Sequence, residues 1–171
     1  IQARYSSSRF PGKVLKKYKK KTLLEILIKR LQKSKFVKKI VVATSISPSN
    51  KEIKSLCKKL NIDCYCGSET DIVDRYYKVA KLFKTKNIIR VTGDCPLIDS
   101  KVIDDVTEFF FTNNADYASN TMPPTFPDGL DVEIFNFKSL EQAWKKSRKI
   151  KRFREHVTTY IRNNLIMNNI D

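Results

Sequence analysis

The sequence lacks several features that would point to a common class of protein. It has one histidine, His156, with no serine or cysteine nucleophile arranged to pair with it. No apolar run approaches the roughly 20 residues that span a bilayer. The four cysteines, Cys57, Cys64, Cys66 and Cys95, have neither the Cys-x2-Cys spacing of zinc sites nor the density of a secreted disulfide scaffold. We expect reduced thiols, a cytoplasmic location and no membrane partner.

Acidic residues are scarce relative to basic ones. Lys plus Arg number 34 and Asp plus Glu number 18, which gives a formal charge of +16 and a pI near 9.8. Such a charge attracts polyanions. The lysines are nevertheless spread over the polar sides of amphipathic segments, and no aromatic-basic interleaving or nucleic-acid reader motif accompanies them. Solvated helix faces are therefore favoured over a nucleic-acid surface, and phosphate-bearing small ligands would still be attracted.

Apolar periodicity alternates between strand and helix along most of the chain. This alternation predicts an α/β fold with a Rossmann-like, doubly wound, mostly parallel sheet. After Asn114 the rhythm breaks, and residues 132–135 follow without a crossover helix, which favours an antiparallel addition. We expect one domain over residues 1–171, cut short at both ends. The expected strands are 1–3, 40–44, 64–66, 87–92, 115–119 and 132–135. Helical periodicity includes Leu24, Ile53, Val73 and Val102, and further helices are expected over residues 137–146 and 154–163; Thr22 would cap the first helix, with Glu25 three residues after it. The last of these helices, residues 154–163, contains His156, for which a structural role is expected.

The stretch from Arg90 to Asp99, Arg-Val-Thr-Gly-Asp-Cys-Pro-Leu-Ile-Asp, is the centre of the functional prediction. A short apolar strand ends there in a turn that carries Asp94. In an open α/β sheet the ligand crevice lies outside the carboxyl ends of the strands, so Asp94 is well placed to hold Mg²⁺ together with phosphate oxygens. The alternative is a capping role for Asp94 at the following helix, although Asp99 and Ser100 stand closer to that helix.

A loop with three cations and three hydroxyls follows the first strand. Residues 4–13 read Arg-Tyr-Ser-Ser-Ser-Arg-Phe-Pro-Gly-Lys, which offers charge-assisted donors to several phosphate oxygens. The loop is not a Walker P-loop, because its glycine spacing differs and no Ser or Thr follows Lys13. Its place at the same sheet edge as Asp94 favours a phosphate-binding role over that of an exposed basic loop.

Three further acids lie close together at the start of the last predicted strand. On an extended segment Asp131 and Glu133 point to the same face, so either could meet a cation held by Asp94. Asp128 stands next to Gly129 and is equally well explained as a turn former.

These motifs, with Gly67-Ser68-Glu69 and Asp74-Arg75-Tyr76-Tyr77, give the chain a family resemblance. It resembles the cytidylyltransferases that activate sugars for cell-surface polysaccharides, in particular the spore-coat polysaccharide biosynthesis protein F type, with CMP-ketodeoxyoctonate and acylneuraminate cytidylyltransferases as relatives. The resemblance implies a fold of the nucleotide-diphospho-sugar transferase type. It also implies CTP and a sugar as substrates and Mg²⁺ as cofactor, and it leaves a homodimer open.

The resemblance assigns roles to individual residues. Arg4, Lys13 and Asp94 would be catalytic, and Asp94 with Asp131 would hold the metal. The nucleotide would be bound by Arg4, Ser7, Ser8, Arg9, Lys13, Ser68 and Arg75. Arg75 would reach the base or the sugar, although its place on a predicted helix suits a surface residue equally well. Gln2 and Cys95 differ from the ketodeoxyoctonate enzymes and shift the match toward the spore-coat type.

The implied reaction is attack by a sugar hydroxyl on the α-phosphate of CTP, which gives a CMP-sugar and pyrophosphate. A glycosyltransferase that uses a nucleotide-sugar donor is the alternative, and the absence of an Asp-x-Asp motif after residues 87–92 counts against it. A basic nucleic-acid-binding module is the third interpretation and the one that the sequence favours least.

Overall fold

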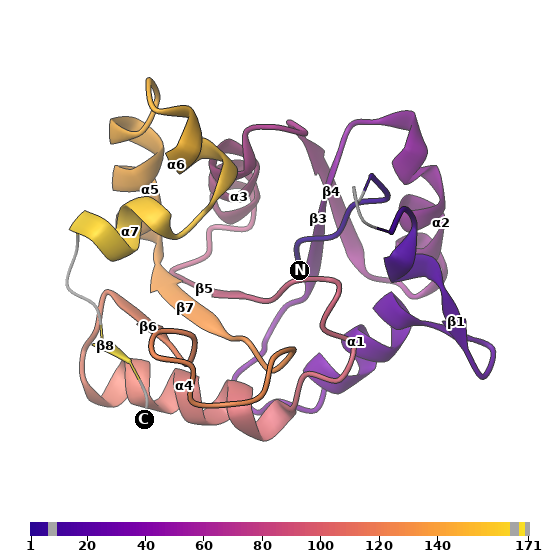
Figure 1. The fold of residues 1–171 in the computed structure, drawn as a ribbon, viewed down its shortest axis with the longest axis horizontal. Helices are drawn as coiled ribbons and strands as arrows, with labels where there is room; N and C mark the ends of the chain where they lie inside the picture. Colours follow the sequence, from indigo (N-terminus) through magenta and orange to yellow (C-terminus); the bar gives the residue numbers. More distant parts are fainter. Residues whose placement is uncertain (7–9, 165–167, 170–171) are drawn as a thin grey trace.

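The computed structural model describes residues 1–6, 10–164, 168 and 169. Its helices are α1 (Leu23–Leu31), α2 (Lys51–Lys59), α3 (Ile72–Leu82), α4 (Ser100–Thr112), α5 (Phe137–Lys146), α6 (Lys151–Glu155) and α7 (Thr159–Asn164), with short 3-10 turns at Lys13–Leu15 and Pro48–Asn50. Its strands are β1 (Lys17–Tyr18), β2 (Lys21–Thr22), β3 (Val41–Ser45), β4 (Asp63–Gly67), β5 (Asn87–Arg90), β6 (Tyr117–Ser119), β7 (Glu133–Asn136) and β8 (Asn168–Asn169). Figure 1 shows their arrangement.

The central sheet is built in two parts that meet at the first residues of the chain. β3 pairs with β4 in parallel, and β5, β7, β6 and β8 follow one another in a second sheet. Gln2 forms parallel bridges to Ala43 in β3 and to Thr92 just after β5, so residues 1–3 lie between the two parts. β7 runs antiparallel to both β5 and β6. The predicted doubly wound sheet with an antiparallel addition is confirmed.

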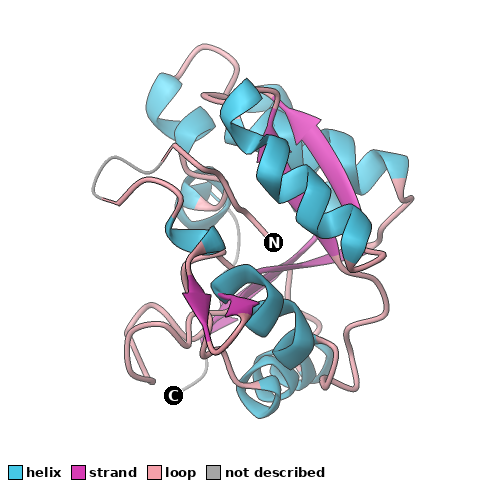
Figure 2. Cartoon of the chain, turned by 90° about the vertical axis from the view of Figure 1, so that its right-hand side faces the viewer, coloured by secondary structure: helices cyan, strands magenta, loops and turns pink. Residues whose placement is uncertain are grey.

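Helices cover both faces of this sheet (Figures 1 and 2). One core contains buried residues of α1, α2 and α4, and the other contains buried residues of α3, α5 and α7. Adjacent residues of β7 show the division, because Ile134 belongs to the first core and Phe135 to the second. Successive side chains of a strand point to opposite faces, so a central strand between two helical layers must be apolar on both.

Side-chain caps fix where the main helices begin. The Thr22 hydroxyl accepts from the Glu25 N–H at 3.1 Å before α1, as the sequence predicts. At α4 the Asp99 carboxylate accepts from the Lys101 N–H at 2.7 Å. Such contacts satisfy N–H groups that the first helical turn leaves free. Asp99 is therefore the cap of α4, and the capping role considered for Asp94 is wrong.

The predicted helix over residues 154–163 is two helices, α6 and α7, and that expectation is wrong in this respect. His156 lies between them with extended backbone angles, φ −118° and ψ 103°. The Arg154 side chain donates to Asp71 Oδ2 at 2.5 and 2.9 Å and to the Trp144 carbonyl at 2.9 Å. These long-range contacts hold the end of α6 and override the local helical preference.

No helix in the described part of the chain has both the length and the apolar character needed to cross a membrane.

Candidate functional site

The chain reverses its direction of winding at one point of the sheet, and the site lies there. From residues 1–3 it proceeds outward to β3 and β4, then returns to β5 on the other side of Gln2. The loop at residues 4–13 follows residues 1–3, and the loop at residues 92–99 follows β5, so both loops leave the carboxyl ends of adjacent strands. Ligands of open α/β sheets bind in the crevice at such a switch point. The predicted phosphate loop and the predicted metal acid therefore face the same crevice.

Lys13 and Asp94 are in direct contact at this point. Lys13 Nζ donates to Asp94 Oδ2 at 2.5 Å, although 81 residues separate the two in sequence. Both side chains keep partial solvent access, with 27% and 41% exposed. Burial by itself raises the pKa of Asp94, but the hydrogen bonds from Lys13 and Thr92 and the Lys13 charge hold that pKa below its ordinary value. Asp94 is thus an accessible, ionised carboxylate.

Glycines let the two loops come close together. The Gly93 N–H donates to the Gln2 carbonyl at 2.8 Å, and a Cβ at this position would lie 3.0 Å from the Ala3 Cβ. Gly12 has φ +68°, and its Cβ would lie 2.8 Å from the Tyr5 ring. A side chain fits poorly at either position. The Tyr5 N–H also donates to the buried Asn50 Oδ1 at 2.8 Å, which ties the first loop to the start of α2.

Asp128 and Asp131, from the later part of the chain, lie within electrostatic reach of Asp94 or of its neighbour Cys95. Burial is the main cause that raises the pKa of Asp131, and the neighbouring charges of Asp128, Glu133 and Asp94 raise it further. Asp128 forms a turn with Gly129, in which the Leu130 N–H donates to the Pro127 carbonyl at 3.2 Å. This bears out its interpretation as a turn former. The crowding of like charges marks a place where a cation would be favoured.

Glu133 has a different environment from Asp131. It is buried and forms an ion pair with Arg90, and it accepts from Tyr117 Oη at 2.7 Å. Burial by itself raises its pKa, but the Arg90 charge and hydrogen bonds from Thr158 and Tyr117 hold the pKa of Glu133 below its ordinary value. Its charge is already compensated within the protein. Between Asp131 and Glu133, Asp131 is therefore better placed to meet a cation.

A polar cavity of about 190 Å³ opens beside these acids. Sequence analysis did not single out most of its walls, and it treated His156 as structural. Its lining carries both charge signs and three hydroxyls, from Arg90, Thr92, Thr121, Asp131, Glu133, His156, Val157, Thr158 and Arg162. Arg90 is the last residue of β5, and this position could have indicated that its side chain lines the cavity. The break between α6 and α7, which brings His156 to the cavity, has no comparable signal in the sequence.

The turn before α3 holds the other predicted nucleotide residues. Arg75 is fully buried, so the surface alternative considered for it is wrong. Its Nη1 donates to the Ser68 carbonyl at 3.1 Å, while Nε and Nη2 have no protein partner in the described part of the chain. The Ser68 hydroxyl accepts from the Asp71 N–H at 2.9 Å. Ser6 donates to Glu69 at 2.6 Å, which links this turn to the first loop.

The remaining predicted residues differ in what the structure describes of them. Arg4 is exposed at the start of the first loop. Burial lowers the pKa of Arg75, and the charge of Arg4 lowers it further. Ser7, Ser8 and Arg9 lie outside the described residues.

Comparison with known proteins identifies the family. The family model described as cytidylyltransferase matches residues 1–169. The chain belongs to the cytidylyltransferase family. It is 43% identical to an uncharacterized protein of Methanocaldococcus jannaschii over 96% of this chain and 66% of that protein. It is 35% identical to the spore coat polysaccharide biosynthesis protein SpsF of Bacillus subtilis over 95% of this chain and 68% of that protein.

A solved cytidylyltransferase has the same fold. The structure from Leptospira borgpetersenii serovar Hardjo-bovis superposes with a TM-score of 0.93 at 33% identity, and the match covers 99% of this chain and 73% of that one. The resemblance to cytidylyltransferases of the spore-coat type is therefore confirmed. The chain spans about two thirds of the length of the two curated relatives.

The donor set at the crevice suits a cation that keeps most of its water. Within the described ranges, no group of three or more His, Cys, Asp or Glu side chains is arranged to hold a metal ion. Mg²⁺ needs only one or two protein carboxylates when phosphate oxygens and water supply its other ligands. In this member of the cytidylyltransferase family, Asp94 and Asp131 fit that requirement, because both are carboxylates whose charges act on one another.

Proposed function

We propose that this chain transfers the CMP group of CTP to a sugar. The sugar hydroxyl attacks the α-phosphorus, the bond to the β-phosphate oxygen breaks, and the products are a CMP-sugar, pyrophosphate and the hydroxyl proton. The observation that carries the proposal is the contact between Lys13 and Asp94 at the switch point of the sheet. This reaction needs a cation for phosphate and a carboxylate for metal at one place, and Lys13 and Asp94 would supply them.

The triphosphate of CTP carries negative charge that repels an incoming oxygen nucleophile, so catalysis rests on positioning the sugar hydroxyl and on neutralising that charge. Lys13 and Arg4 would contact the β- and γ-phosphates, where charge collects on the leaving pyrophosphate. Arg9 would add a bidentate contact that a lysine cannot make. Ser7 and Ser8 would donate hydrogen bonds to the same oxygens. The described residues include no Ser-His or Cys-His pair that could supply a nucleophile. Burial is the main cause that raises the pKa of Cys95, and the charges of Asp94, Asp131 and Asp128 raise it further, so its thiol stays protonated.

Asp94 and Asp131 would hold Mg²⁺. When bound, the ion would withdraw charge from the phosphate oxygens. Lys13 has a second role in this arrangement. Its ammonium group occupies Asp94 Oδ2 at 2.5 Å, so before CTP arrives it balances the carboxylate that would otherwise be unpaired. We expect Lys13 to move from Asp94 to the phosphates when the nucleotide and metal bind.

The nucleoside and the sugar would occupy opposite sides of the Lys13 and Asp94 contact. On one side lie Ser68 and Arg75, and the two unpaired, buried guanidinium nitrogens of Arg75 offer donors for cytosine or ribose. On the other side lies the cavity of about 190 Å³, with Thr121, Thr158 and Arg162 in its walls. Hydroxyls and cations of this kind suit a polyhydroxylated acceptor.

Calorimetric titration with CTP, ATP, GTP and UTP in the presence of Mg²⁺ tests the nucleotide part of the proposal. We expect CTP alone to bind tightly, and we expect the Asp94→Asn variant to lose metal-dependent binding while its circular dichroism spectrum stays unchanged. Equal binding of all four nucleotides, or unchanged binding in Asp94→Asn, would contradict the assignment.

Pyrophosphate release then tests the reaction. A screen of sugars with CTP should give pyrophosphate in step with a CMP-sugar. Consumption of a preformed nucleotide-sugar without pyrophosphate would instead support a glycosyltransferase.

A further inference from the structure

A short hairpin rich in lysine projects from the molecule just before α1. β1 and β2 form it as an antiparallel pair, with Lys17 opposite Thr22. Residues 16–21 read Lys-Lys-Tyr-Lys-Lys-Lys, and every one of these side chains is exposed, Tyr18 to 62%. Figure 1 shows the hairpin at the edge of the molecule. We call residues 16–21 the basic hairpin.

Neighbouring acids do not compensate the charge of the basic hairpin. Residues 1–24 contain no Asp or Glu, and Glu25, which follows them, pairs with Lys29 at 3.0 Å. Among the described residues, no ion pair includes a lysine of the basic hairpin. Lys39, in contrast, pairs with Asp63 at 2.5 Å. The basic hairpin therefore presents its full positive charge to the solvent.

The turn of the basic hairpin carries lysines where other residues fit better. Lys19 and Lys20 join the two strands with φ angles of 45° and 69°, in the left-handed region. A two-residue hairpin turn with positive φ at both positions is of type I′, for which Asn-Gly is preferred. A lysine at either position costs stability that glycine would not cost. Residues that break a local rule in this way often serve a role outside the fold.

The composition of the basic hairpin favours a bilayer surface over a nucleic acid as its partner. All its cations are lysines, which are hydrated point charges, whereas arginine predominates in nucleic-acid recognition. Lysine clusters are attracted to anionic lipids, and each charge adds to the binding. An exposed tyrosine, here Tyr18, suits the level of the lipid headgroups. The expectation of no membrane partner came from the lack of a spanning segment, and binding of this kind needs none.

We propose that the basic hairpin docks the chain reversibly onto an anionic lipid bilayer, with its lysines against the headgroups and Tyr18 between them. The base of the hairpin is fixed to the first loop. The Lys16 N–H donates to the Lys13 carbonyl at 3.0 Å, and the Leu23 N–H donates to the Lys16 carbonyl at 2.9 Å. Docking would therefore hold the first loop close to the bilayer. The proposal does not depend on the reaction that the crevice carries out.

Vesicle sedimentation of three chains tests the proposal. The parent is compared with a hairpin variant, Lys19→Asn with Lys20→Gly, which removes two charges and supplies the preferred turn sequence. The vesicles are phosphatidylcholine alone or phosphatidylcholine mixed with phosphatidylglycerol. A short DNA duplex serves as the competing polyanion, and Tm is measured for every chain.

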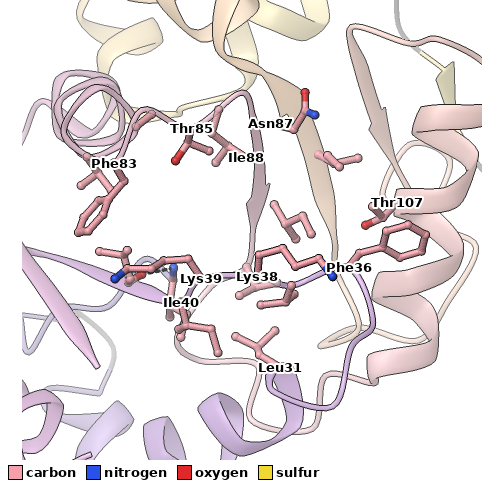
Figure 3. Close-up of a pocket in the computed structure, with 18 of the residues that line it drawn as sticks. Leu31, Phe36, Lys38, Lys39, Ile40, Phe83, Thr85, Asn87, Ile88 and Thr107 are labelled. Carbon is pink, nitrogen blue, oxygen red and sulfur yellow. Dashed lines mark hydrogen bonds between the residues drawn. The ribbon is translucent and has the colours of Figure 1, made fainter. Parts of the chain in front are cut away.

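The third chain is a matched control, Lys84→Gly with Lys86→Asn. Both lysines are exposed and lie between α3 and β5, and Lys84 also has a positive φ, 50°. Figure 3 shows the neighbours of Lys84, Phe83 and Thr85, in the wall of a cavity at the amino end of β5. The control thus removes the same charge from a different part of the surface.

We expect the parent to bind the anionic vesicles and not the neutral ones. Each lysine near an anionic surface strengthens binding by about fivefold, so the hairpin variant should bind about 25-fold more weakly. Its Tm should be no lower than that of the parent, because Asn-Gly relieves the turn. The control should bind as the parent does.

Three results would overturn the proposal. The first is a parent that does not bind the anionic vesicles, or that binds neutral vesicles equally well. The second is an equal loss of binding in the hairpin and control variants, which would show that only net charge matters. The third is tighter binding to the DNA duplex than to the anionic vesicles, lost in the hairpin variant, which would assign the basic hairpin to a nucleic acid.

Discussion

Replacing Glu133 by Gln should destabilise the protein strongly, although Glu133 lies beside the acids of the site. Its side chain is 6% exposed and that of its partner Arg90 is 20% exposed. The substitution keeps the shape and removes the charge, so Arg90 is left as a buried, uncompensated cation. Breaking a buried ion pair in this way costs about 3–5 kcal/mol. For a domain of this size, that loss lowers Tm by roughly 10 °C.

Asp131→Asn is the matched control. Burial and the neighbouring acids raise the pKa of Asp131, so folding disfavours its ionised form and removal of the charge costs no stability. We expect its free energy of unfolding to stay within about 0.5 kcal/mol of the parent. Metal-dependent CTP binding should be lost in this variant. The two variants should therefore distinguish the roles of the two acids: Glu133 would stabilise the fold, and Asp131 would act in metal binding.

Urea unfolding at several pH values measures how each substitution changes the free energy of unfolding. The pKa of Glu133 is lowered in the folded protein, so its contribution is fully present above the unfolded value of about 4.3 and is lost as pH falls through the folded value. The difference between the parent and Glu133→Gln should therefore shrink in acid. A Glu133→Gln variant as stable as the parent at neutral pH, or an Asp131→Asn variant that loses several kcal/mol, would refute the reasoning.

Four other changes give equally direct expectations. Lys13→Gln should weaken CTP binding by roughly 10- to 100-fold in calorimetry, and Lys13→Arg should recover part of that loss. Asn50→Ala removes the acceptor of the Tyr5 N–H and should cost about 1–3 kcal/mol in urea unfolding. Gly12→Ala, at φ +68° and against the Tyr5 ring, should cost at least about 1 kcal/mol in the same assay. Mg²⁺ affinity in the presence of CTP should fall as pH drops through the raised pKa of Asp131, because the protonated carboxyl no longer binds the cation.

The meeting of Lys13 and Asp94 could be predicted because it follows from sheet topology. Each residue follows the carboxyl end of a strand, and adjacent parallel strands bring those ends to one edge. Hydrophobic periodicity likewise located the main helices, and the Thr22 cap was foreseen from the spacing to Glu25. In these cases local pattern and global fold agree, so each one indicates the other.

The roles of Glu133 and His156 could not be foreseen in the same way. Glu133 and Asp131 share one face of an extended segment, but only the packing of Tyr117 and Arg90 around one of them decides which is neutralised. His156 reaches the cavity at the break after α6, next to Arg154, which Asp71 holds from 83 residues away in the sequence. Both outcomes depend on contacts between distant segments, which the residues next to Glu133 and His156 in the sequence do not indicate.

Because β7 runs antiparallel to β5, the two walls of the crevice come from different parts of the sequence. Because β7 starts where β5 ends, the segment before Glu133 arrives at the crevice edge, where a parallel strand would deliver it to the far side of the sheet. The wall of Lys13, Ser68 and Asp94 comes entirely from the first hundred residues, and the cavity wall beyond Thr92 comes from residues after 120. Under the proposed function, substitutions after residue 120 would change the acceptor specificity and leave the residues proposed to bind the nucleotide unchanged.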